Sequence, residues 1–195
     1  MSADQASTGT GAEEVAALAG AARFFGDLLL HELTLETLAV LQAEPLVGAL
    51  GLGSLGTVPR TAAAVDELAA DFHAALLAPT GGGAPPVASL WLEGRYEGER
   101  VARLRQASAA AGLDFDHEAA RGAPIDHLGA LLHLWASASE RAPWLADELA
   151  AEHLDWTDRP LGQIEAQGGL YGELATALRA FVPELRATRL SPATR

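Results

Sequence analysis

The chain has 195 residues, of which 49% are hydrophobic and 20% charged, and its formal net charge is −13. It contains no cysteine, and all 13 of its basic residues are arginine. These absences exclude disulfides, thiolate metal ligands, cysteine nucleophiles, Schiff-base lysines and a P-loop lysine. The negative charge opposes binding to a phosphate backbone, so we expect no nucleic-acid partner. Abundant alanine and leucine favour helices over strands.

The N-terminal residues 1–11 are small and polar, and we expect them to form a disordered tail. A single all-α domain is expected over residues 12–186, with a second tail over residues 187–195. The start of the chain lacks the positive and apolar regions of a secretion signal, and the longest uncharged stretch, 72–92, contains glycines and prolines. We therefore expect a cytoplasmic protein without stable membrane insertion.

Apolar residues recur every three or four positions through most of the chain, which predicts a series of helices. Thr61 suits the N-cap of one helix, Gly112 the end of another, and Pro124 the first turn of the next. Residues 79–88 are rich in glycine and proline and predict a loop, and 113–122 form an acidic connector. Helices are expected from Glu13 through at least Leu29, over about 35–41 with a continuation to 50 left open, from Thr61 through at least Leu76, over 97–111, from Pro124 to about 140, over 145–153, from Asp158 onward and over 170–185. Residues 86–92 are expected to be extended or to form a single turn.

Several kinds of catalytic or metal site were tested against the sequence and do not match. The acidic residues from Asp114 onward resemble a calcium-binding loop, but Ala119 replaces its required glycine and Ile125 its required glutamate. The zinc-binding His-Glu-x-x-His pattern does not occur, and residues 81–83 are glycines without a following lysine. We expect a protein that is not an enzyme and binds no cofactor or metal. A metal- or nucleotide-dependent helical enzyme, its ligands drawn from distant segments, is the alternative from a different class.

Two segments resemble a known family. The first is Asp71-Phe-His-Ala-Ala-Leu-Leu-Ala-Pro-Thr80, followed after the glycines by Pro85-Pro-Val-Ala-Ser-Leu-Trp-Leu92. The second is Pro124-Ile-Asp-His-Leu128, and the pattern Glu152-His-Leu-Asp-Trp156 continues the similarity downstream. Together they resemble the TorD/DmsD/NarJ family of redox-enzyme maturation chaperones. That family usually has a glutamate just before the proline of the second segment, where this chain has Gly122-Ala123.

The resemblance implies an all-helical TorD-like chaperone that needs no cofactor. Its partner would be a molybdopterin-dependent oxidoreductase, held by its twin-arginine signal peptide or as the apo form until the molybdopterin is inserted. A NarJ-like assembly factor, which grips a non-exported apo-subunit, is the alternative within the family. The glycine-rich segments leave open a monomer or a helix-exchanged dimer.

The client-binding residues expected from the two segments are Phe72, Leu76, Leu77, Pro86, Ser89, Trp91, Leu92, Pro124, Asp126 and His127. We expect the apolar members to line a groove and the Asp126 carboxylate to bind arginine at its rim. Six of them also have a structural interpretation: Phe72, Leu76, Leu77 and Trp91 as core, Asp126 as a first-turn acid, and His127 as a hydrogen-bonding partner. The small residues Gly129 and Ala130 either leave a groove open beside Asp126 or allow a second helix to pack closely.

Overall fold

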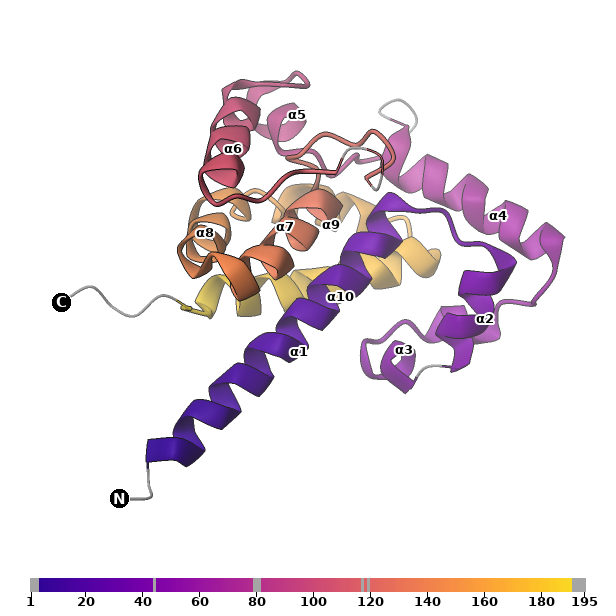
Figure 1. Cartoon of the computed structure of the whole chain (residues 1–195). Helices are drawn as coiled ribbons and strands as arrows, with labels where there is room; N and C mark the ends of the chain where they lie inside the picture. Colours follow the sequence, from indigo (N-terminus) through magenta and orange to yellow (C-terminus); the bar gives the residue numbers. More distant parts are fainter. Residues whose placement is uncertain (1–3, 44, 79–81, 117, 119, 191–195) are drawn as a thin grey trace.

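The computed structural model describes residues 4–43, 45–78, 82–116, 118 and 120–190. Within these residues there are ten α-helices and no β-strand, and one isolated antiparallel bridge joins Val87 to His127. The expected all-α class is confirmed. The α-helices, shown in Figure 1, are α1 Asp4–Leu30, α2 Leu35–Ala43, α3 Pro45–Ala49, α4 Ala62–Phe72, α5 Ala88–Glu93, α6 Glu99–Ala110, α7 Leu128–Arg141, α8 Pro143–Glu148, α9 Asp158–Glu165 and α10 Gly169–Ala187.

Three short helical segments of other kinds complete the order. The 3₁₀ helix η1 is Gly53–Thr57, and the two π-helical turns are η2 His73–Leu77 and η3 Leu149–His153. Each π turn continues directly from an α-helix, η2 from α4 and η3 from α8. Single π turns of this kind shift the faces that follow them, and they are frequent near functional sites.

Helix α1 is longer than expected at its N-terminus. It begins at Asp4, so the expected disordered tail is wrong for residues 4–11, while residues 1–3 lie outside the described part of the chain. The early sequence contains no proline, and its polar and small residues lower helix propensity without forbidding a helix. At the other end, α10 stops at Ala187, close to the expected boundary, and residues 188–190 are not helical.

Two expected helix signals are confirmed, and one start is displaced. The Thr61 hydroxyl accepts a hydrogen bond from the Ala64 N–H at 3.3 Å and caps α4. Gly112 follows α6 with a φ of 65°, the left-handed conformation that ends helices. Helix α7, however, begins at Leu128 and not near Pro124, because the preceding backbone is bonded to residues 86–88 and cannot be helical.

Helices α1 and α7 pack against each other near the centre of the molecule, α8 also packs against α7, and α9 packs against α10 (Figure 1). The expected apolar stripe of α7, which includes Leu128, Leu131 and Trp135, is fully buried. The small residues of α7 were expected either to leave a groove open or to allow a second helix to pack closely, and at Gly129 the second helix is α1. A Cβ added to Gly129 would lie 2.9 Å from the Gly26 carbonyl oxygen, so Gly129 serves close helix packing.

Candidate functional site

A cleft of about 460 Å³ opens between η2, the end of α1 and the loop that precedes α7. It contains five of the residues expected from the sequence: Phe72, Leu76, Leu77, Pro124 and His127. Phe72 and Leu76 are buried in its floor, whereas Leu77 is 46% exposed at its edge. The remaining lining residues are Leu29, Leu30, Glu32, Pro85, Val87, Tyr96, Ala120, Arg121, Gly122 and Ala123.

The π turn η2 explains how adjacent leucines serve different surfaces. The Ala78 N–H donates to the His73 carbonyl oxygen, five residues back, at 3.0 Å. Leu76 is thereby 1% exposed and belongs to the core, while Leu77 remains available at the cleft. Residues 79–81 of the expected loop lie outside the described part of the chain. Its later part contacts the turn, because the Ala84 N–H donates to the Ala75 carbonyl oxygen at 2.9 Å, and Pro85 and Val87 line the cleft.

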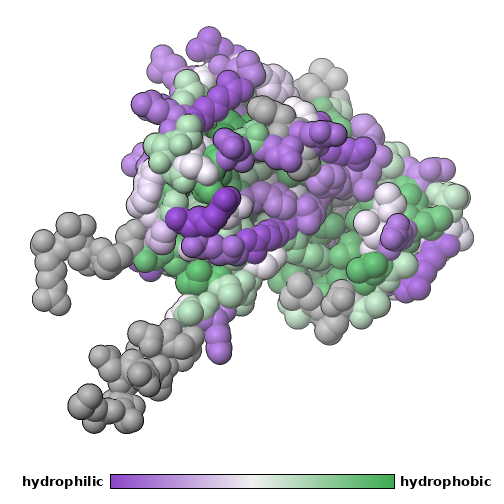
Figure 2. All heavy atoms as spheres, viewed as in Figure 1, coloured by the Kyte–Doolittle hydropathy of each residue, from purple (hydrophilic) through white to green (hydrophobic). Residues whose placement is uncertain are grey.

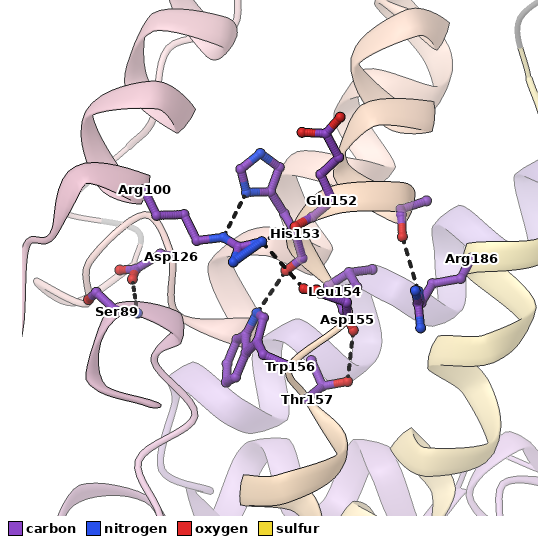
Figure 3. Close-up of polar contacts among 11 residues, drawn as sticks. Ser89, Arg100, Asp126, Glu152, His153, Leu154, Asp155, Trp156, Thr157 and Arg186 are labelled. Carbon is purple, nitrogen blue, oxygen red and sulfur yellow. Dashed lines mark hydrogen bonds and ion pairs between the residues drawn. The ribbon is translucent and has the colours of Figure 1, made fainter. Parts of the chain in front are cut away.

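The two family-like segments meet directly behind this cleft. The Leu128 N–H donates to the Pro86 carbonyl oxygen at 2.8 Å, and the Ala88 N–H donates to the Asp126 carbonyl oxygen at 3.0 Å. The Asp126 side chain reinforces the contact, since its Oδ2 accepts the Ser89 N–H at 2.7 Å (Figure 3). We call these paired residues, 86–89 and 126–128, the segment junction.

Asp126 is not at a rim, so the expected position of its carboxylate was wrong. Asp126 and Ser89 are both 0% exposed, and Pro86 is buried as well. The Asp126 Oδ1 and Ser89 Oγ atoms have no hydrogen-bond partner among the described residues. The backbone of α5 needs an acceptor at this place, because an unpaired buried N–H is costly. In this structure Asp126 therefore fixes the junction from inside.

His127 combines a structural role with a place in the cleft wall. Its Nδ1 accepts the Gly129 N–H at 3.1 Å and caps α7. An accepting Nδ1 carries no proton, so the neutral ring has its proton on Nε2. Burial lowers the pKa of His127 from 6.5 to about 4, and the ring is therefore uncharged near neutral pH.

Trp91 and Leu92 lie outside the cleft. The Trp91 Nε1–H donates to the Pro85 carbonyl oxygen at 2.7 Å, so the indole positions a cleft residue without lining the cleft itself. Leu92 is 49% exposed on α5. The structure thus brings five of the ten expected residues into the cleft and places Pro86, Ser89 and Asp126 behind it. Trp91 and Leu92 belong to neither group.

Sequence reasoning missed the cleft residues that α1 and the irregular loops contribute. Arg121 has a φ of 51° and Gly122 a φ of 78°, and this left-handed pair turns the chain along the cleft. Tyr96, from the loop between α5 and α6, is 50% exposed at the opening. A positive φ at Arg121 leaves no clear sequence signal, although the glycine that follows it marks a turn.

A second set of polar contacts joins α6 to η3 and involves the downstream pattern Glu152-His-Leu-Asp-Trp156. The Arg100 guanidinium donates to the Glu152 carbonyl oxygen and, at 3.3 Å, to the His153 Nδ1 (Figure 3). Burial, with Arg100 and Arg103, lowers the pKa of His153 to about 4. Glu148, Glu152 and His153 lie close enough to hold a metal ion, but the guanidinium on the same ring opposes a cation there. We assign no metal site to this cluster.

Among the described residues, no helix is long and apolar enough to cross a membrane. The cleft is enclosed mainly by apolar side chains, which suits it to an apolar segment of another protein. A family model described as nitrate reductase delta subunit matches residues 35–161, and the chain belongs to this family, whose members are chaperones for the maturation of molybdoenzymes. No curated protein sequence matches the chain.

Proposed function

We propose that this chaperone holds the twin-arginine signal peptide of a molybdopterin-dependent oxidoreductase in the cleft beside η2. Binding takes place in the cytoplasm, before the enzyme is exported, and ends once the molybdopterin is in place. The protein then performs no chemistry and needs no cofactor of its own. The observation that carries the proposal is the cleft itself, to which both family-like segments contribute lining residues.

The cleft suits the apolar stretch of such a leader. Leu77 and Tyr96 are about half exposed at its edge, and covering them with apolar side chains would remove that surface from water. His127 is uncharged near neutral pH, so the inner wall carries no ionised imidazole that the leader would have to desolvate. A helical leader would anchor one face in the cleft, as amphipathic helices do in apolar grooves.

A NarJ-like mode, in which the cleft grips an apolar segment of the apo-subunit, uses the same surface. The two modes differ in whether the client must carry a leader. Full-length and leaderless forms of the recovered oxidoreductase, each tested for binding, separate them. We favour the leader because its apolar stretch can be short and helical, which fits a cleft of about 460 Å³.

The test is affinity capture of the tagged full-length protein from its own host, with mass spectrometry of the captured proteins. Leu77→Asp and Leu92→Asp form a matched pair, because both leucines are about half exposed and only Leu77 lines the cleft. We expect the wild-type protein and Leu92→Asp to recover a molybdopterin oxidoreductase with its uncleaved leader, and Leu77→Asp to recover little. Equal recovery by both variants would overturn the cleft as the binding site.

A further inference from the structure

The cleft does not account for the two arginines of a leader. Its charged lining residues are Glu32 and Arg121, so their formal charges cancel. Glu32 already pairs with the His73 Nε2 at 2.9 Å. Asp126, the expected acceptor, is buried behind the wall. Two guanidinium groups in the cleft would thus face the Glu32 carboxylate, which is already paired, and the positive charge of Arg121.

A separate groove of about 360 Å³ adjoins the cleft between the end of α1 and α2, and the two share Glu32. Its lining combines apolar and acidic side chains and contains no arginine: Phe24, Asp27, Leu28, His31, Glu32, Leu33, Glu36, Thr37, Val40 and Leu41. Figure 2 shows apolar surface gathered between α1 and the α2–α3 segment, with hydrophilic side chains bordering it. We call this the α1–α2 groove.

We infer that the α1–α2 groove receives the arginine pair of the client leader, while the apolar stretch that follows continues past Glu32 into the cleft. The inference rests on the proposed function and adds a direction to it. The basic end of the leader lies at α2 and its apolar end at Arg121.

The charges of the groove support a cationic occupant. Asp27, Glu32 and Glu36 give it a formal charge of −3, and among the described residues Glu36 makes no ion pair. Asp27 contacts the His133 Nε2 at 3.0 Å, a weaker competitor than a permanently charged guanidinium. Arginine stems could pack on the exposed Val40 side chain, and a guanidinium could stack on Phe24.

The same charges argue against a second copy of this chain as the occupant through its projecting N-terminal helix. The part of α1 before Arg23 carries Asp4, Glu13 and Glu14 and contains no basic residue. Like charges would face each other in such a dimer. A basic and apolar segment from a different protein fits both the sign of the groove and the apolar character of its floor.

The experiment measures binding of two synthetic peptides to the full-length protein by titration calorimetry. One peptide has two adjacent arginines before an apolar stretch of about twelve residues, and the other has glutamines in place of the arginines. The protein variants are Glu36→Arg in the groove and Glu67→Arg on the exposed face of α4, which change the net charge equally. Circular dichroism first establishes that both variants are folded.

We expect the arginine peptide to bind the wild-type protein about tenfold more tightly than the glutamine peptide. Glu36→Arg should abolish that difference and leave binding of the glutamine peptide unchanged, whereas Glu67→Arg should preserve it. If both peptides bind the wild-type protein equally, or if Glu36→Arg acts no more strongly than Glu67→Arg, the groove inference is wrong and the cleft proposal stands. If neither peptide binds, the leader-binding proposal itself fails.

Discussion

The segment junction and the α1–α2 groove make opposite use of polar side chains. At the junction, Asp126 and Ser89 are completely buried and the Asp126 carboxylate accepts a backbone N–H. In the groove, Asp27, Glu32 and Glu36 stand at an open surface on an apolar floor. At the junction, residues of the family-like segments hold the cleft wall in shape, and in the proposed binding mode acids outside those segments supply the charge for the client's arginines. The family-like segments thus locate the cleft, but they do not locate the acidic groove beside it.

The largest expected effect on stability is at Asp126, where it tests whether the carboxylate supports the segment junction. Asp126→Ala removes the acceptor of the buried Ser89 N–H and should lower the free energy of unfolding by about 3 kcal/mol. Asp126→Asn retains an oxygen acceptor for the Ser89 N–H. It should cost less than about 1 kcal/mol. Urea denaturation of the two variants measures both values.

Peptide binding by the Asp126→Asn variant tests whether the Asp126 carboxylate contacts the client. Because Asp126 is behind the wall, the asparagine variant should bind the arginine peptide like the wild-type protein. A stable Asp126→Asn protein that has lost the preference for arginine over glutamine would show that the carboxylate reaches the client. The division between a supporting junction and a charged groove would then be wrong.

His127 belongs to the junction and to the cleft wall, and its titration should be visible in stability. The unfolded imidazole takes up a proton near pH 6.5, whereas burial holds the folded pKa at about 4. Between these values the unfolded chain binds more protons, so stability should fall as the pH drops from 6.5 to 4, by up to about 3 kcal/mol. His153 has the same direction of shift and adds to this fall.

His127→Asn separates the two histidines. Asparagine supplies an oxygen that can replace Nδ1 as the acceptor of the Gly129 N–H, and it does not titrate in this range. The variant should unfold with a shallower dependence on pH between 6.5 and 4, while the contribution of His153 remains. Chemical denaturation at a series of pH values gives the slope. An unchanged slope would mean that His127 is not the buried neutral base described here.

The features that could be predicted from the sequence are those set by short stretches of chain. Thr61 caps α4 because its own hydroxyl reaches a backbone N–H three residues on, and Gly112 ends α6 through its own φ. The start of α7 depends on another segment, since bonds with residues 86–88 hold Asp126 and His127 out of a helix. The π turn η2 is likewise bonded to another segment, through the Ala84 N–H and the Ala75 carbonyl oxygen. The α1–α2 groove depends on how two helices meet, so Glu36 could not be recognised from sequence spacing.

Helix α1 connects the two regions, because it crosses α7 just after the junction and its C-terminal end forms the groove. A Cβ at Gly129 would lie 2.8 Å from the Leu30 Cγ and 2.9 Å from the Gly26 carbonyl oxygen. We expect Gly129→Ala to separate the helices and to cost about 2 kcal/mol of stability. Gly20→Ala, also in α1 but with open space around it, should instead stabilise by up to about 1 kcal/mol.

The same pair of variants shows whether the crossing sets the geometry of the groove. If α1 positions Asp27 and Glu32 relative to the cleft, Gly129→Ala should weaken binding of the arginine peptide more than binding of the glutamine peptide. Gly20→Ala should weaken binding of neither peptide. Calorimetric titration at a temperature where both variants remain folded makes the comparison. Equal weakening of the binding of both peptides would mean that the crossing of α1 and α7 supports only the cleft. The acids of the groove would then bind the arginines independently of that crossing.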